Sequence, residues 1–142
     1  MAHGDRIVRK PSVDYLNDTI SWGKGWSFVK LFRGFGSIAA KLSGGAVITT
    51  VELADYIAYG SNLLCNRTKD NPLNNEDIMG ITGYSEKQIA RIMDELVSAK
   101  VFARTKVGKS YQYYANPYIF ARGNRINKTL EAMFKYYPYK NA

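Results

Sequence analysis

The sequence predicts an α+β fold that is mainly helical: a winged helix-turn-helix with a C-terminal β-hairpin wing and a terminal helix. Three observations predict it. Two short helical patterns separated by glycines occupy residues 74–99, two β-forming runs joined by "GKS" follow at 101–115, and an apolar stripe at helical spacing lies near the C-terminus. Helix, helix and β-hairpin in this order are typical of a winged helix.

The first helix of the pair has a clear beginning and end. Asn74 can cap it, with Asp77 three residues on in its first turn. Leu73 and Ile78 stand at the two positions of a hydrophobic staple. Gly83 lies close ahead, so this helix is predicted to be short.

The second helix begins with a capping box, in which Ser85 is followed three residues later by Gln88. Its apolar residues recur at helical spacing and form one stripe: Ile89, Ile92, Met93, Leu96 and Val97. Such a stripe is predicted to be core. Two helices joined by a tight glycine-containing turn are the layout of a helix-turn-helix, although helical hairpins of other kinds share it.

Two β-forming runs follow these helices. "VFARTKV" (101–107) and "YQYYA" (111–115) are predicted strands, with "GKS" as the turn between them. The tyrosines are interpreted mainly as packing residues of the hairpin. Lys106 and Lys109 at the tip remain free to approach phosphates, and Pro117 ends the second strand because it lacks a backbone donor.

The chain is expected to form one domain after a tail. Residues 1–20 are predicted to be a flexible tail, and residues 21–142 a single winged-helix domain. Within it the helix-turn-helix spans about 74–99, the wing about 101–115 and the terminal helix about 125–137.

The part of the domain before residue 74 has weaker patterns. "WSFVKLF" (26–32) predicts a short strand and residues 37–42 a short helix, which Gly44-Gly45 interrupts. A longer helix is predicted from Ala46 to Tyr59, stopped by Gly60. Its apolar positions at helical spacing are Val47, Val51, Ala54 and Ala58. A brief strand is expected after Gly60.

Charge indicates a polyanionic partner. The net charge is +8 with a pI near 9.6, and residues 96–130 carry seven basic side chains and no acidic one. An ordinary solvated face mixes both signs, so nucleic-acid contact is favoured. One cysteine, no signal peptide and no apolar run long enough for a membrane span predict a cytoplasmic protein without membrane contact.

Catalysis is not expected. The only histidine, His3, lies in the tail, which leaves no material for a catalytic triad, a histidine-bound metal or a zinc site. "GKS" at 108–110 would need a glycine where Ala103 stands to end a phosphate-binding loop, and it lies between strands. The sequence therefore predicts a protein that is not an enzyme and needs no metal or cofactor.

The stretch "NNEDIMGITGYSEKQIARIMDELVSAKVFARTKVGKSYQYYANPYIFARGNR" resembles the winged-helix region of the Firmicute plasmid replication protein family called RepL. In that family, too, a helix-turn-helix and a glycine-containing hairpin precede an aromatic strand, an Asn-Pro pair, an aromatic residue and a glycine. The matching positions here are Asn116, Pro117, Phe120 and Gly123. The resemblance covers about residues 26–130 and implies DNA binding in plasmid or phage replication by a dimer.

These patterns predict a sequence-specific double-stranded DNA-binding protein in initiation or control of plasmid or phage replication. A winged-helix transcriptional repressor is the first alternative, and a non-catalytic module that binds an acidic partner protein is the second. The candidate DNA-contacting residues are Ser85, Lys87, Gln88, Arg91, Arg104, Lys106, Lys109, Arg122 and Arg125.

Protein partners are also expected. A homodimer is predicted, with host replication proteins as further candidates. The dimer would use the strand around Phe28, the apolar face of the terminal helix, or both. The alternative is that this helix packs on its own domain. Its apolar face consists of Ile126, Leu130, Met133 and Phe134.

Overall fold

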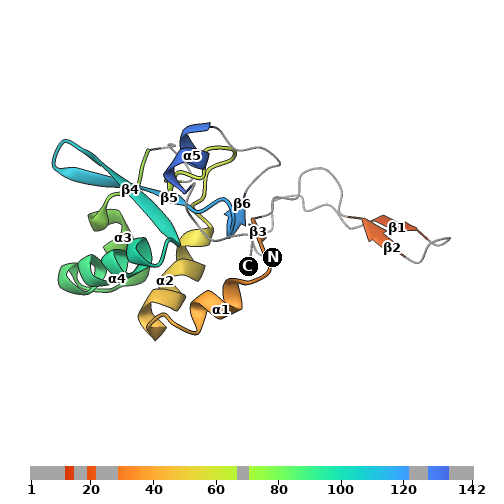
Figure 1. Ribbon diagram of the computed structural model, residues 1–142, viewed down its shortest axis with the longest axis horizontal. Coiled ribbons are helices and arrows are strands. Elements are labelled where there is room, and N and C mark those ends of the chain that lie inside the picture. The colour runs from red at the N-terminus through yellow and green to blue at the C-terminus, as the bar shows by residue number, and fades with distance from the viewer. Residues whose placement is uncertain (1–11, 15–18, 22–28, 67–70, 122–127, 135–142) are drawn as a thin grey trace, which may run out of the picture.

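The computed structural model describes residues 12–14, 19–21, 29–66, 71–121 and 128–134. Over these residues the chain is α+β, with five helices and a two-stranded antiparallel hairpin (Figure 1). One buried apolar cluster joins the helices to the hairpin. The arrangement is compatible with a winged helix. Among the described residues no helix is long and apolar enough to cross a membrane.

Helix α3 (Asn75–Thr82) begins and ends as predicted. The Asp77 N–H donates to the Asn74 side chain at 2.8 Å, and the Asn74 N–H donates to the Asp77 carboxylate at 3.0 Å. Leu73 and Ile78 are both buried, as a hydrophobic staple requires. Gly83 ends the helix with φ +79°, a left-handed conformation that glycine adopts without strain.

Helix α4 (Glu86–Ser98) also confirms its predicted cap. The Gln88 N–H donates to Ser85 Oγ, and the Ser85 N–H donates to Gln88 Oε1. Four residues of the predicted stripe are buried: Ile89, Ile92, Met93 and Leu96. Val97 is half-buried at the edge of the core. Burial of this stripe fixes which side of α4 faces outward.

Helix α2 (Gly44–Ala54) differs from the prediction. Gly44-Gly45 do not interrupt a helix but form the first turn of this one, because Ser43 caps it. A Cβ at Gly45 would lie 3.3 Å from Ile92 Cδ1, so the glycine allows α2 to approach α4 closely. The helix also ends at Ala54 instead of Tyr59.

The predicted apolar face of α2 was wrong at Val51, whereas Val47 and Ala54 are half-buried and Ala54 packs against the core. Val51 is 64% exposed, and neighbouring Ile48 is exposed too. The side that packs on the domain carries smaller residues and threonines: Ala46, Thr49, Thr50 and Leu53. Thr50 satisfies its buried hydroxyl by donating to the Ala46 carbonyl at 2.8 Å. The close approach to α4 favours this narrow face over one centred on Val51.

The region before α2 is built from short elements. Helix α1 (Phe35–Ala39) begins two residues before the predicted start at residue 37. Strand β3 (Lys30–Leu31) pairs antiparallel with β6 (Phe120–Ala121) and is the described part of the predicted strand at 26–32. The rings of Phe35 and Phe120 lie 5.6 Å apart and hold α1 against β6.

Strands β4 (Phe102–Val107) and β5 (Ser110–Ala115) form the predicted hairpin. Gly108 and Lys109 make its two-residue loop. Gly108 has φ +63°, whereas Lys109 has a negative φ, which is typical of a type II′ turn. Leu63 forms a β-bridge with Tyr114 on the other edge of β5. The segment after Gly60 was expected to be a strand, but it forms only isolated β-bridges.

Two buried asparagines hydrogen-bond to backbone groups near the end of the hairpin. Asn116, fully buried, donates from Nδ2 to the Lys100 carbonyl at 2.7 Å and accepts from the Tyr118 N–H at 2.8 Å. Asn62 donates from Nδ2 to the carbonyls of Ala115 and Phe120. The Asn116-Pro117 pair is therefore a structural corner between α4, β5 and β6.

The chain ends differ in part from expectation. Strands β1 (Ser12–Asp14) and β2 (Thr19–Ser21) pair within the predicted tail and lie apart from the other elements (Figure 1). Helix α5 (Lys128–Met133) lies within the predicted 125–137. Its Leu130 and the following Phe134 are buried in the domain's own core, so these two residues are not exposed for a dimer. Ile126 and Phe28 lie outside the described residues.

Candidate nucleic-acid interface

The outward side of α4 carries two basic residues one turn apart. Lys87 and Arg91 are both exposed, and neither belongs to the buried stripe. Spacing of four residues places them on the same side of the helix. Lys87 lies in the first turn of α4, which begins at Glu86. The structure thus brings together two of the predicted contact residues on an open helix surface.

Ser85 and Gln88 have a different role, because both take part in the helix cap. Ser85 Oγ accepts a hydrogen bond at 3.2 Å and Gln88 Oε1 accepts one at 2.9 Å. Gln88 retains its amide NH₂ group as a donor on an exposed side chain. These residues primarily fix the start of the helix that carries Lys87 and Arg91.

Glu95 lies one turn beyond Arg91, near the C-terminal end of α4. Its two carboxylate oxygens accept from the Ser43 N–H and the Ser43 hydroxyl, each at 2.7 Å. Ser43 is also the N-cap of α2. One carboxylate therefore ties the end of α4 to the beginning of α2, a contact that the sequence pattern did not indicate.

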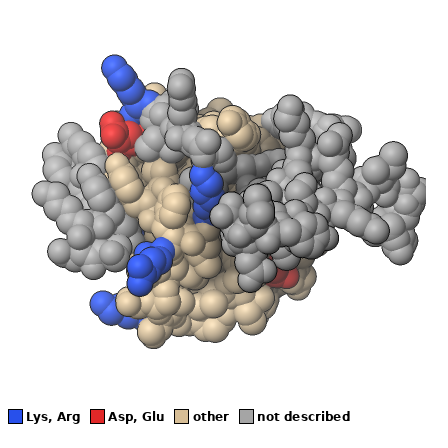
Figure 2. All heavy atoms as spheres, turned by 90° about the vertical axis from the view of Figure 1, so that its right-hand side faces the viewer, with Lys and Arg blue, Asp and Glu red and all other residues tan. Residues whose placement is uncertain are grey.

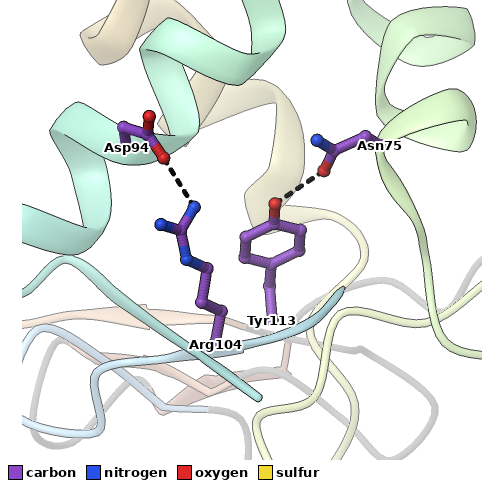
Figure 3. A network of polar contacts seen from close by, with 4 residues as sticks. All are labelled: Asn75, Asp94, Arg104 and Tyr113. Carbon is purple, nitrogen blue, oxygen red and sulfur yellow. Dashed lines mark hydrogen bonds and ion pairs between the residues drawn. The ribbon is translucent and has the colours of Figure 1, made fainter. Parts of the chain in front are cut away.

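Arg104 is engaged within the protein (Figure 3). Its Nη1 lies 2.7 Å from Asp94 Oδ1, and its guanidinium lies 4.5 Å from the centre of the Tyr111 ring. Burial lowers the pKa of Arg104, but hydrogen bonding to Asp94 and its charge outweigh this and leave the pKa raised. Arg104 consequently joins β4 to α4, and this occupation removes it from our set of DNA contacts.

Tyr113 makes a parallel connection from β5 to α3 (Figure 3). Its hydroxyl donates to Asn75 Oδ1 at 2.6 Å while its ring is fully buried. Burial raises the pKa of Tyr113, although Arg104 and Asn75 act in the opposite direction. Together, Arg104 and Tyr113 attach the two strands of the hairpin to the two helices. Sequence reasoning missed Asn75 and Asp94, whose partners are distant in the chain.

The tip of the hairpin lies beside the beginnings of α3 and α4. Lys106 and Lys109 are exposed there. A hollow of about 540 Å³ separates the tip from the helices. Its lining residues are Asn74, Asn75, Glu76, Met79, Glu86, Ala90, Lys109, Ser110 and Tyr111. Glu76 and Glu86 bring negative charge close to Lys109.

The remaining two candidates, Arg122 and Arg125, lie outside the described residues. Figure 2 shows the side of the domain that carries β3 and β6, away from the hairpin tip in Figure 1. Where described residues are visible on it, Lys and Arg side chains stand apart on a mostly uncharged surface. A continuous basic patch is not visible on that part of the surface.

Within the described ranges no group of histidine, cysteine and acidic residues could hold a metal ion. Comparisons with protein-family models, with curated proteins and with solved structures each found no match.

Proposed function

We propose that this protein binds double-stranded DNA sequence-specifically through a winged helix-turn-helix, with α4 in the major groove and the β4–β5 tip on neighbouring phosphates. The major groove is about 12 Å wide and admits one α-helix. The proposed role is initiation or control of plasmid or phage replication, carried out by binding and not by catalysis.

The observation that carries this proposal is the outward side of α4. Lys87 and Arg91 are exposed one turn apart on a helix whose cap and buried stripe fix its orientation. An arginine can engage guanine O6 and N7 with two hydrogen bonds, the commonest specific contact to a base edge. We therefore assign base reading to Arg91, with Lys87 beside it.

The hairpin supplies the phosphate contacts in this account. Lys109 borders the same hollow as Glu86 and Ala90 of α4, so the tip lies next to the start of that helix. Lys106 and Lys109 are exposed and can each neutralise a phosphate. Arg104 acts through Asp94 as a positioning residue, because it holds β4 against α4.

Glu76 and Glu86 lower the affinity of the hairpin tip for DNA in general. Carboxylates beside Lys109 repel phosphates, so they lower affinity for any duplex that brings its backbone into the hollow. Glu86, in the first turn of α4, can accept a hydrogen bond from a cytosine amino group instead. This arrangement favours discrimination between sequences over raw affinity.

The replication role rests on the resemblance of residues 74–125 to the RepL family. A transcriptional repressor would use the same interface. Recovery of bound fragments from the source genome tests both: a cluster of repeats at a replication origin supports the proposed role, and a promoter supports repression. Fragments enriched for no common sequence contradict sequence-specific binding. The proposed homodimer is tested by light scattering at tens of micromolar protein.

A further inference from the structure

A second hollow lies at the C-terminal end of α4, one turn beyond Arg91. It has a volume of about 520 Å³, within the range of about 300–1,000 Å³ that is typical of small-molecule sites. One wall comes from α1 and the turn after it, and the other from the last turn of α4 and the two residues that follow it. The lining residues are Ser37, Ile38, Lys41, Leu42, Glu95, Ser98, Ala99 and Lys100. We refer to it as the α1/α4 pocket.

The α1/α4 pocket has an apolar floor and a polar rim. Ile38, Leu42 and Ala99 are half-buried and pack against the core. Ser37 and Ser98 are exposed at the margin. Mostly apolar lining with a few polar groups is the usual composition of a site for a small organic ligand.

The charged residues of the rim indicate which charge the ligand carries. Lys41 and Lys100 are both exposed. The one acidic residue, Glu95, already accepts two hydrogen bonds from Ser43 at 2.7 Å. These hydrogen bonds leave the carboxylate charged, but the two lysines outnumber it, so the lining has a net positive charge that favours an anionic group on the ligand.

The backbone at the rim is held in place. Lys100 has φ +65°, a conformation that non-glycine residues rarely adopt. Its carbonyl accepts from buried Asn116 at 2.7 Å, which fixes this turn. The pocket wall is consequently built by the fold.

We propose that the α1/α4 pocket binds a small apolar carboxylate, with its hydrocarbon part on Ile38, Leu42 and Ala99 and its carboxylate between Lys41 and Lys100. Occupancy acts on α4, because the ligand lies against Glu95, one turn beyond Arg91, and beside the tie between Glu95 and Ser43. This second step rests on the proposed DNA binding and is tested separately.

Calorimetric titration of the full chain, without DNA, tests the pocket. The probes are 4-phenylbutyrate and 4-phenylbutylamine, which share a ring and spacer but carry opposite charges. We expect the carboxylate to bind one site per chain with a Kd of about 0.1–1 mM, and the amine at least about ten-fold more weakly. Equal affinities, or no binding of either probe at several millimolar, would overturn the proposal.

Variants locate the binding site. Ala99→Leu fills the floor and should abolish binding, whereas Ala90→Leu, at an α4 alanine that lines the other hollow, should leave it unchanged. Lys41→Gln and Lys100→Gln should each weaken binding about two- to five-fold, as expected for exposed ion pairs. Should Ala99→Leu fail to fold, the two lysine variants decide. Unchanged affinity in both would contradict the assignment.

The effect on α4 is measured as duplex affinity with and without saturating 4-phenylbutyrate. A change of at least about three-fold that Ala99→Leu abolishes supports coupling of the two sites, a modest allosteric effect. Unaltered duplex affinity overturns the coupling alone. Failure to bind any duplex overturns the proposed function. The calorimetric test of the pocket is made without DNA, so its result does not depend on that outcome.

Discussion

Arg104 and Asp94 form an ion pair, with 2.7 Å between Nη1 and Oδ1, that joins the first strand of the hairpin to the outward side of α4. The pair lies between the two parts of the proposed DNA interface. Tyr111 packs on the guanidinium from the second strand. The direction of the hairpin relative to α4 thus depends on this contact in addition to the buried apolar cluster that both elements share.

This contact makes a prediction about stability. The side chains of Arg104 and Asp94 are 27% and 64% exposed, so solvent screens the pair. We expect a double-mutant cycle with Arg104→Ala and Asp94→Ala, measured by urea unfolding, to give a coupling energy of about 0.2–1 kcal/mol. Arg104→Ala should cost more than Asp94→Ala, because it also loses the contact with Tyr111. No coupling energy would show that the pair does not form in solution.

Tyr113 predicts how stability changes at alkaline pH. Its pKa is raised in the folded protein, mainly by burial, above the unfolded value of about 10. The contribution of the protonated Tyr113 hydroxyl to the free energy of unfolding is therefore complete below pH about 10. It is lost as pH rises through the pKa of the folded protein. The free energy of unfolding should fall by up to about 1.4 kcal/mol per pH unit more steeply than in Tyr113→Phe. Parallel curves for the two proteins between pH 10 and 11 would contradict this.

Asn116 predicts the largest loss of stability. It is fully buried, and its side chain bonds the Lys100 carbonyl and the Tyr118 N–H. Asn116→Ala removes both buried hydrogen bonds and should lower the free energy of unfolding by about 2–4 kcal/mol. Asn74→Ala is the matched control, since it removes an exposed cap and should cost about 1 kcal/mol. A smaller loss for Asn116→Ala than for the control would contradict the corner role.

Lys109 tests the phosphate contacts of the hairpin tip. Each phosphate that a lysine neutralises contributes about −0.9 to the slope of log affinity against log salt. Lys109→Ala should flatten that slope by about 0.9 per protomer and weaken binding to all duplexes alike. Arg33→Ala, an exposed basic residue ahead of α1, is the control and should leave the slope unchanged. An equal slope for Lys109→Ala and wild type would remove the tip from the interface.

The sequence predicted best what forms within one helical turn. The caps at Asn74 and Ser85 and the stripe on α4 were found because capping partners lie three residues apart and the stripe repeats at helical spacing. The hairpin followed from its β-forming runs and the glycine of its turn. Local chemistry was sufficient for these elements.

Long-range packing determined what the sequence did not predict. The buried side of α2 depends on its close approach to Ile92, so Thr49 and Thr50 are inside and Val51 is outside. Arg104 pairs with Asp94 across a helix-to-strand connection, and Tyr113 with Asn75 across 38 positions. Periodicity reports which side of an element is apolar but not which element covers it.

Arg91 provides the most direct measurement of the central claim. Affinity should be compared for the wild type and Arg91→Ala on the duplex recovered by selection and on a random duplex, at one fixed salt concentration. Base reading predicts that Arg91→Ala loses affinity for the selected duplex and keeps it for the random one, which narrows the specificity ratio about 5- to 150-fold. An equal loss on both duplexes would contradict base reading by this side of α4 and make Arg91 a phosphate contact.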